Sequence, residues 1–387
     1  MTSELPTHKQ KQHIIIVGGG VIGCCCAYYI ASHEHFDPSN HTITLIEASD
    51  IAGGSSGKAA GCLAAWADPH CLASASFKLH AELAAEHGGE DGWGYRKVFS
   101  ADCDTTHGRL GDSDDRTAVS AAIDWVDHSV FKWYKPLENT AQVHPHQFTT
   151  SLAILAQRRG VSIKNAIARC INYSADGTEV QSVTMEDGLT SVFSEVIATN
   201  VILAAGPWTS ILFPQAPIGG EKSHSIVIRP PRPISPHILF FDPSHIDTDK
   251  ANQLEIYPRP DGTVYLSGQT DYGLDLPPSS SDVLSDPERC QKLMNNVALV
   301  SPVLAKSEVV TQQACFRPIV KVDGRDPELG PLLGFTGIEG MILAAGHNQW
   351  GIQNAPITGK VVAELIWEGR AKSADIEELD PRNYLTT

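Results

Sequence analysis

Three glycines near the start of the chain have the spacing of a site for a phosphate-bearing ligand. The stretch "IIIVGGGVIG" carries Gly18-x-Gly20-x-x-Gly23 directly after a β-branched run, Ile14 to Val17. Gly18 permits a tight turn, Gly20 lets the backbone approach a pyrophosphate, and Gly23 lets a helix pack closely on the strand. That helix is expected to begin near Val21 and to point its positive N-terminus at the phosphates.

An acidic residue further along supports this interpretation. The strand-like stretch "TITLIE" ends in Glu47, 24 residues past Gly23. A carboxylate at that spacing is placed to accept hydrogen bonds from ribose hydroxyls. Together the two features favour a dinucleotide site over a chance glycine turn. Because Glu47 would repel a 2′-phosphate, NADP is disfavoured, and FAD and NAD remain as candidates.

A second stretch with chemical potential is "QACFRPIV", Gln313 to Val320. It places a thiol, Cys315, two residues before Arg317, and no other strong charge follows until Lys321. Cys315 is either a small core residue or a reactive thiol. Arg317 is either a surface cation or a binding group, and the stretch by itself leaves both alternatives open.

The elements that would position these residues include two near-copies, "VILAAGPW" (Val201 to Trp208) and "MILAAGHNQW" (Met341 to Trp350). Each is a buried strand run that ends in a small-residue turn, as needed where backbone approaches a planar ligand. Two parallel core strands without a ligand are the alternative. The second copy leads into a predicted helix with Pro356 near its start and Gly369 as its stop. The apolar face of that helix comprises Val361, Val362, Leu365 and Ile366.

Further along, "LEIYPRPDGTVYLSG" (Leu254 to Gly268) alternates like two strands joined through Asp261-Gly262, which predicts a hairpin of an antiparallel sheet. Asp286-Pro287 predicts a helix start. The acidic stretch "ADCDTTHGRLGDSDDR" predicts a solvated loop.

Composition narrows the class of protein. A length of 387 residues suffices for two domains, and a formal charge of −16 makes nucleic acid and acidic membrane surfaces poor partners. Nine cysteines without repeated spacing, three of them adjacent at Cys24, Cys25 and Cys26, indicate reduced thiols and a cytoplasmic protein. The uncharged run from Ile14 to Ser32 imitates a membrane segment, but its glycines argue against one.

Metal and acyl-transfer chemistry find little support. His33, His35 and His41 have the spacing of a polar loop, and the sequence contains no C-x-x-C or H-E-x-x-H motif. No nucleophile elbow is assigned, so acyl transfer is not expected. No metal ligands are therefore assigned.

Taken together, the motifs resemble the superfamily of D-amino-acid oxidase, glycine oxidase and sarcosine oxidase, which are FAD enzymes. The glycine motif, Glu47, "GGSSGKAAG", "HPHQF", "AAGPW", "FRP" and "AAGHNQWGI" occur in the order found there, from Ile14 to about Ile366. Within it the chain is most similar to a fungal subgroup of cytosolic FAD oxidoreductases.

The resemblance implies an α/β (α+β) fold with a Rossmann-like FAD-binding domain and a mostly antiparallel-sheet substrate domain. The FAD-binding domain is expected to be discontinuous, with residues 1–75, 143–214 and 331–387. Residues 76–142 and 215–330 are expected to form the substrate domain.

The resemblance also implies a set of cofactor-binding residues. The glycines would contact the pyrophosphate, Glu47 the ribose, and the stretch after Ala345 the flavin's pyrimidine edge, where amides and a helix N-terminus stabilise negative charge. The full set is Gly18, Gly20, Val21, Ile22, Gly23, Glu47, Ala48, Ser55, Ser56, Lys58, Ala60, Gly61, Ala168, Ala205, Gly206, Trp208, Gly346, His347, Asn348, Trp350, Gly351 and Ile352.

On the substrate side, the resemblance places Arg317 over the flavin as the group that grips a substrate carboxylate with two parallel hydrogen bonds. Cys315 stands where sarcosine oxidases attach the flavin covalently and glycine oxidases have glycine, so a covalent link is possible and an inert core cysteine is the alternative. Trp350 replaces the lysine of the sarcosine oxidase clamp. Tyr257 stands where the family often has a substrate-side tyrosine, or is a sheet aromatic.

The resulting expectation is an FAD-dependent oxidase of a small amine or amino acid. The substrate's Cα hydride would pass to flavin N5, the imine would be hydrolysed, and O2 would be the electron acceptor, giving hydrogen peroxide. The alternatives are an FAD dehydrogenase with another acceptor, and a flavin-binding trafficking or regulatory module with little turnover.

Overall fold

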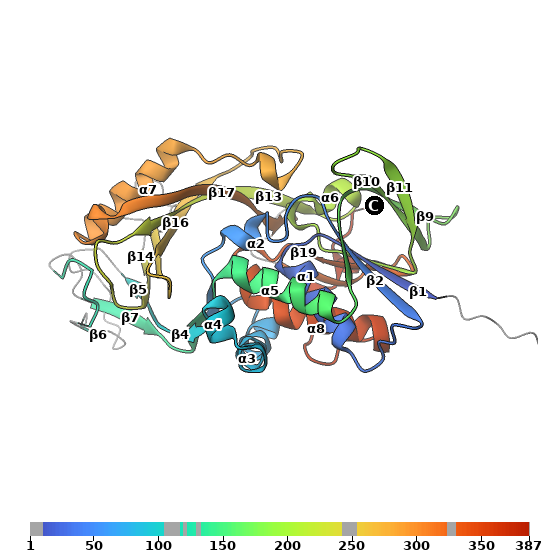
Figure 1. Cartoon of the computed structure of the whole chain (residues 1–387), viewed down its shortest axis with the longest axis horizontal. Coiled ribbons are helices and arrows are strands. Elements are labelled where there is room, and N and C mark those ends of the chain that lie inside the picture. Colours follow the sequence, from blue (N-terminus) through green and yellow to red (C-terminus); the bar gives the residue numbers. More distant parts are fainter. Residues whose placement is uncertain are drawn as a thin grey trace, which may run out of the picture.

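The computed structural model describes residues 11–103, 117–118, 122–128, 133–241, 254–322 and 330–386. Two large sheets lie towards opposite ends of an elongated molecule, and helices lie between and beneath them (Figure 1). The ligand-binding residues expected from the sequence lie on both sheets and on the segments that join them.

The first sheet contains eight strands in the described part of the chain. Its centre, from β9 to β19, is parallel, and β10, β11 and β18 add antiparallel margins. In spatial order the strands are β11 (Phe193–Ile197), β10 (Val180–Asp187), β9 (Ser162–Tyr173), β2 (His41–Glu47), β1 (Gln12–Val17), β12 (Asn200–Leu203), β19 (Met341–Ala345) and β18 (Leu332–Phe335). This arrangement confirms the predicted Rossmann-like part of the fold.

The residues of β1 explain why this strand is central. Ile14 and Ile16 face one hydrophobic cluster and Ile15 and Val17 face another, because successive side chains of a strand point to opposite sides. All four are at most 4% exposed. An apolar run without alternation is thus a strand buried on both faces.

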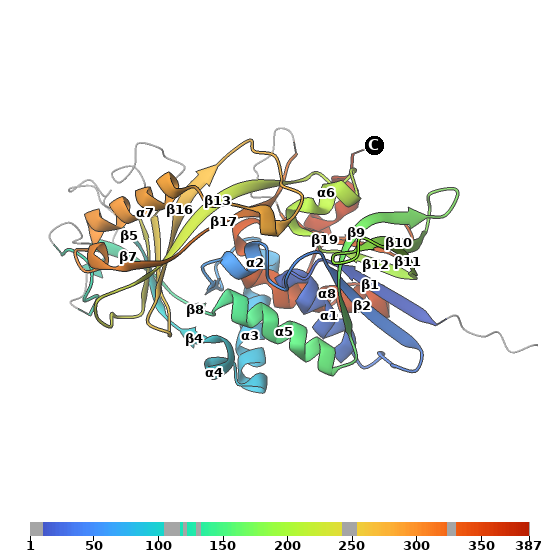
Figure 2. The ribbon, with the colours of Figure 1, turned by 45° about the horizontal axis from the view of Figure 1, so that its top comes forward.

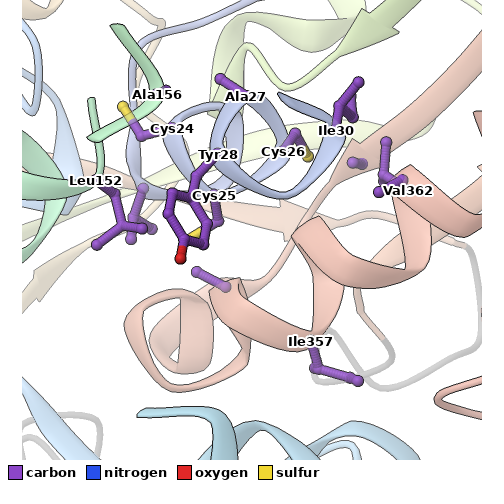
Figure 3. Packing of buried hydrophobic residues seen from close by; sticks show 14 of the residues in the cluster. Cys24, Cys25, Cys26, Ala27, Tyr28, Ile30, Leu152, Ala156, Ile357 and Val362 are labelled. Atoms are coloured by element: carbon purple, nitrogen blue, oxygen red, sulfur yellow. The ribbon is translucent and has the colours of Figure 1, made fainter. Parts of the chain in front are cut away.

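Three helices cover one face of this sheet: α1 (Val21–Ser32), α5 (Pro145–Arg158) and α8 (Gly351–Glu368). Figure 3 shows α1 between the other two, with Cys24 on the side of Ala156 and Cys26 on the side of Val362. A Cβ on Gly359 would lie 2.6 Å from the carbonyl carbon of Cys25, so the two helices touch at backbone distance. The three adjacent cysteines are fully buried packing residues.

The predicted boundaries of α8 are close to those observed. Gly369 ends it with φ +74°, as expected for a C-terminal glycine. Pro356 lies in the second turn, slightly deeper than predicted.

The second sheet also contains eight described strands and is antiparallel except between β14 and β5. In spatial order they are β17 (Glu308–Val320), β13 (Ile218–Arg229), β16 (Val264–Asp271), β15 (Leu254–Pro258), β14 (His237–Phe241), β5 (Phe99–Cys103), β7 (Trp133–Leu137) and β6 (Thr117–Ala118). The mostly antiparallel sheet was predicted.

Two local predictions for this sheet are confirmed. The strands β15 and β16 form a hairpin in which Thr263 N–H donates to Asp261 Oδ1 at 2.9 Å. Helix α7 (Pro287–Val300) begins after Asp286, whose carboxylate accepts from Glu288 N–H, and it packs against β13 and β16 (Figure 2).

Smaller elements join the two sheets. A three-stranded sheet has the order β3 (Cys62–Ala64), β8 (Thr140–Gln142), β4 (Arg96–Lys97), and the short helices α2 (Ser55–Lys58) and α6 (Thr209–Leu212) border the sheets. Helix α3 (His70–His87) packs against α8, and the short helix α4 (Gly89–Trp93) packs against α5. The exact division into domains stays a prediction.

Three further sequence features can be located. All nine cysteines are free. Of the acidic stretch expected to be a loop, residues 101–103 end β5, which corrects the prediction there because their backbone pairs with β14 and β7, and the rest lies outside the described residues. Among the helices of the described residues, none has the length and apolar character needed to span a bilayer.

Candidate cofactor and substrate site

The glycine turn between β1 and α1 leaves no room for side chains. Gly18 has φ +112°, and a Cβ there would lie 2.3 Å from the carbonyl oxygen of Ala204. A Cβ on Gly23 would lie 1.9 Å from the carbonyl oxygen of Gly18. Gly18 therefore permits the turn, and Gly23 serves close packing of helix on strand, as the motif predicts. Gly23 lines neither of the two cavities near this turn, and its contact with the pyrophosphate stays a prediction.

Glu47 at the end of β2 is held in a defined orientation. Its Oε2 accepts from Gly19 N–H at 2.6 Å, and its Oε1 accepts from the N–H and the hydroxyl of Ser49, both at 2.8 Å. These bonds tie the carboxylate to the glycine turn. Oε2 accepts only one of these bonds and retains a lone pair that can accept from a ligand hydroxyl.

A cavity of about 210 Å³ opens beside this turn. It follows the N-terminus of α1, the ends of β2 and β12, the middle of β9, and the segment that leads into α8. Predicted residues that line it are Gly18, Gly20, Val21, Ile22, Glu47, Ala48, Ser55, Ser56, Ala168, Ala205, Gly206, Trp208, Gly346, His347, Asn348 and Gly351.

A segment after β16 covers part of this cavity. Trp208 Nε1–H donates to the carbonyl of Pro277 at 2.8 Å, and the hydroxyls of Ser49 and Ser280 are hydrogen-bonded at 2.8 Å. The covering residues were not predicted from the sequence, because they belong to none of the assigned motifs and Pro277 lies 69 positions from Trp208.

Lys58 at the end of α2 ties this helix to the second sheet. Its Nζ donates to the carbonyl of Ala314 at 3.1 Å, and its own carbonyl accepts from the hydroxyl of Tyr265 and from Gln313 Nε2. Burial lowers the pKa of the Lys58 ammonium, and the neighbouring Cys315 acts in the opposite direction. The resemblance assigned Lys58 to the cofactor loop, and here it also reaches β17.

A larger cavity, about 580 Å³, lies under the second sheet. It shares Val21, Ser55, Ser56, Asn348 and Gly351 with the smaller one, so the two adjoin each other. Predicted residues that line only this part are Lys58, Ala60, Gly61, Tyr257, Cys315, Arg317, Trp350 and Ile352.

Arg317 projects from β17 into the larger cavity opposite Glu221 of β13. The two residues pair across the strands, and Arg317 Nη2 donates to Glu221 Oε2 at 3.2 Å. Arg317 Nε is buried and has no hydrogen-bond partner among the described residues. The guanidinium is thus held by one contact and retains donors for a ligand.

Tyr257 of β15 lines the same cavity and is 3% exposed. Its hydroxyl donates to Glu255 Oε2 at 2.5 Å. Burial, together with the charge of Glu255, raises the pKa of Tyr257 well above its ordinary value. The phenol therefore stays protonated at neutral pH and acts as a hydrogen-bond donor.

Cys315 lies two residues from Arg317 on the cavity face of β17. Burial raises the pKa of its thiol, and the positive charges of Arg317 and Lys58 partly oppose that shift. The thiol is in reach of a ligand but is not activated as a thiolate.

The segment between β19 and α8 carries two unusual polar groups. Asn348 has φ +46°, and its side-chain Oδ1 is buried without a partner among the described residues. His347 Nε2 is hydrogen-bonded to the hydroxyl of Thr358 at 3.0 Å, and burial lowers the pKa of His347 to about 3. An acceptor without a partner at the junction of the two cavities fits a ligand that carries an N–H.

These features fit FAD. The side-chain-free turn and the N-terminus of α1 suit its pyrophosphate, Glu47 suits a ribose, and Asn348 and the N-terminus of α8 suit the polar edge of the flavin. A sequence profile described as DAO, FAD dependent oxidoreductase, matches residues 13–365.

The chain belongs to the DAO family of FAD-dependent oxidoreductases.

Relatives and solved structures agree with this assignment. The chain is 33% identical to C1F5.03c of Schizosaccharomyces pombe, covering 92% of this chain and 94% of that protein. It is 29% identical to TDA3 of Saccharomyces cerevisiae, covering 97% and 95%. The crystal structure of glycine oxidase from Geobacillus kaustophilus superposes with a TM-score of 0.75 at 19% identity, covering 97% of this chain and all of that one, which shows a common fold.

Some cavity residues had no motif to reveal them. Asp102, Glu221 and Glu255 line the larger cavity from β5, β13 and β15. Only the pairing of β13 with the predicted β17 strand could have located Glu221. Within the described residues, no group of three or more histidine, cysteine, aspartate or glutamate side chains has a metal-binding arrangement.

Proposed function

We propose that this FAD-dependent oxidoreductase oxidises a CH–NH or CH–NH2 group of a small amine, and specifically of an amino acid. The observation that carries the proposal is Arg317, a cation inside the larger cavity whose buried Nε has no hydrogen-bond partner in the described part of the chain. A guanidinium in such a place suits a carboxylate. The name of the glycine oxidase that shares the fold supports the same class of substrate.

The residues of the cavity would mainly orient the substrate. Arg317 would hold the carboxylate, and the protonated Tyr257 would donate a hydrogen bond through its contact with Glu255. The Arg317–Glu221 and Tyr257–Glu255 pairs, together with the apolar walls of the cavity, would keep water from the reacting carbon. A bound FAD would supply the hydride acceptor, with O2 as the proposed final electron acceptor. Nine free cysteines are consistent with a reducing compartment such as the cytoplasm.

The proposal is tested by anaerobic bleaching of the flavin absorbance with a panel of amino acids and of the matching amines without a carboxylate. Bleaching by an amino acid, with a much weaker effect of its amine, is the expected result. Rapid recovery of the colour in air identifies an oxidase, and slow recovery identifies a dehydrogenase with another acceptor. No bleaching by any member of the panel would contradict the proposal and favour a flavin-binding module.

A further inference from the structure

The charged residues of the larger cavity are divided between its two ends. Arg317 and Glu221 pair across β17 and β13 at one end. Glu255 pairs with Phe240, and Phe240 pairs with Asp102, along a row that crosses β15, β14 and β5. One end therefore carries a cation with its counterion, and the other carries two carboxylates.

The cations that line the cavity already have partners elsewhere. Within the described lining, Lys58 and Arg317 are the positive residues, and Asp102, Glu221 and Glu255 are the negative ones. Lys58 Nζ is bonded to the carbonyl of Ala314, and Arg317 to Glu221. Neither therefore acts as the counterion of Glu255.

Glu255 is held by neutral donors on one side only. Its Oε2 accepts from the hydroxyl of Tyr257 at 2.5 Å and from the hydroxyl of Ser267 at 3.1 Å. For Oε1, no partner appears within the described part of the chain. Among the described residues Glu255 has no counterion. A partly buried carboxylate in this state is costly, and a cationic ligand that donates a charge-assisted hydrogen bond would stabilise it.

The two ends are well separated. The path from Glu221 to Glu255 runs four positions along β13, to Ser225, and then two strand spacings across the sheet, through β16 to β15. This corresponds to roughly 16 Å between their backbones. Both side chains line one continuous space of about 580 Å³. A ligand that reaches both ends is therefore an extended chain and not a compact amine such as glycine.

We propose that Glu255 selects substrates that carry a second cationic group, an ammonium or guanidinium, at the end remote from the carboxylate bound by Arg317. The substrate class is then a basic amino acid, which carries an ammonium or guanidinium on its side chain. The inference rests on the proposed function for the Arg317 end of the site. It adds Glu255 as the residue that determines specificity at the other end.

The selection can be measured without turnover. Hexanoate and 6-aminohexanoate have the same chain and carboxylate, lack an α-amine, and differ by one terminal ammonium. Their dissociation constants for the FAD-loaded protein are obtained from the change in flavin absorbance. We expect 6-aminohexanoate to bind at least about tenfold more tightly than hexanoate.

Glu255→Gln provides the matched variant. The glutamine carbonyl can still accept from Tyr257 and Ser267, so the fold is preserved while the negative charge is lost. The preference for 6-aminohexanoate is expected to fall to within about twofold, with hexanoate binding nearly unchanged. Arg317→Met should weaken both ligands alike.

Several outcomes would overturn the inference. These are equal binding of the two ligands by the wild-type protein, no binding of either, and a preference that survives Glu255→Gln but disappears in Asp102→Asn. Comparison of lysine with norleucine in anaerobic bleaching separates this inference from the proposed function. A ligand preference that depends on Glu255, without bleaching by any amino acid, would support the selection and contradict the oxidation.

Discussion

Arg317 and Glu221 face each other across neighbouring strands, with Arg317 Nη2 donating to Glu221 Oε2 at 3.2 Å and side chains that are 23% and 17% exposed. An ion pair that is only partly shielded contributes little stability by itself. Its position in the cavity wall gives it a different consequence, because the guanidinium is already oriented and a substrate carboxylate has to share it with Glu221.

Arg317→Met is expected to lower kcat/KM for an amino-acid substrate by at least about tenfold. Removal of one partner of a hydrogen-bonded charge pair costs roughly 2–5 kcal/mol when the pair is buried, and a factor of ten corresponds to about 1.4 kcal/mol. The matching amine without a carboxylate should be almost unaffected, and FAD content should stay near wild type. Steady-state kinetics and the flavin-to-protein absorbance ratio provide the two measurements.

Glu221→Gln is the control for that variant. It removes the competing anion and keeps a side chain of the same size, so the KM for the amino acid should fall, the opposite direction from Arg317→Met. If Arg317→Met lowers kcat/KM equally for the amino acid and for the matching amine, or if the variant loses its flavin, Arg317 is a structural residue.

The purified protein is expected to be yellow, and Gly20→Val should lose most of its FAD. A Cβ on Gly20 would lie 3.0 Å from Ser56 Oγ, and the valine methyl groups would enter the smaller cavity. Gly92→Val is a suitable control, because a Cβ there meets no atom within 4 Å. Retention of full flavin absorbance by Gly20→Val would argue against a dinucleotide at this turn.

The flavin is expected to be released by acid. Burial keeps the pKa of the Cys315 thiol above its ordinary value, which disfavours the thiolate that covalent attachment requires. After acid precipitation the yellow colour should therefore appear in the supernatant, in the wild type and in Cys315→Ala alike. Colour that stays in the wild-type pellet and is released only in Cys315→Ala would establish a covalent link through Cys315.

Acid is expected to destabilise the protein through its buried histidines. Burial lowers the pKa of His347 to about 3 and the pKa of His80 to about 4, whereas a histidine in the unfolded chain has a pKa near 6.5. Between these values the unfolded chain binds protons that the folded chain does not. The free energy of unfolding should therefore be fully retained above pH 6.5 and should decrease as the pH falls, by at most about 1.4 kcal/mol per pH unit and histidine.

The effect of His347 is isolated by measuring Tm from pH 7.5 to 5.0 in the wild type and in His347→Gln. The variant should show a smaller decrease of Tm over this range, since glutamine does not titrate. An identical pH dependence in both proteins would show that His347 is not buried as a neutral side chain.

Gly359→Val is expected to destabilise the contact between α1 and α8. The added carbons would meet the backbone of Cys25 at 2.6 Å, and overpacking of this kind typically costs about 1–3 kcal/mol. Denaturant unfolding of the wild type and the variant measures the difference. An unchanged midpoint would mean that the two helices can separate at this point without loss.

The cofactor half of the site depends largely on local sequence. The run Ile14 to Val17, the glycine turn and Glu47 belong to one strand–helix–strand unit, and the two small-residue turns follow their own strands. Short connections hold the strand–helix–strand unit together, and parallel pairing brings β12 and β19 beside β1. Almost every residue assigned to the cofactor lines one of the two cavities. Gly23 is the exception, because it packs beneath Gly18.

The substrate half was decided by tertiary structure. Arg317 and Tyr257 could be assigned through motifs, and Glu255 shares the face of Tyr257 because it lies two residues before it on the predicted strand. Nothing in the spacing of Glu221 and Asp102 indicates that they share a cavity with these residues. The order of strands in the second sheet, and the register between strands nearly a hundred residues apart, place these groups on one face. Local sequence specifies which residues form a strand and which of its faces is polar, whereas the neighbours of that face depend on long-range pairing of the whole sheet.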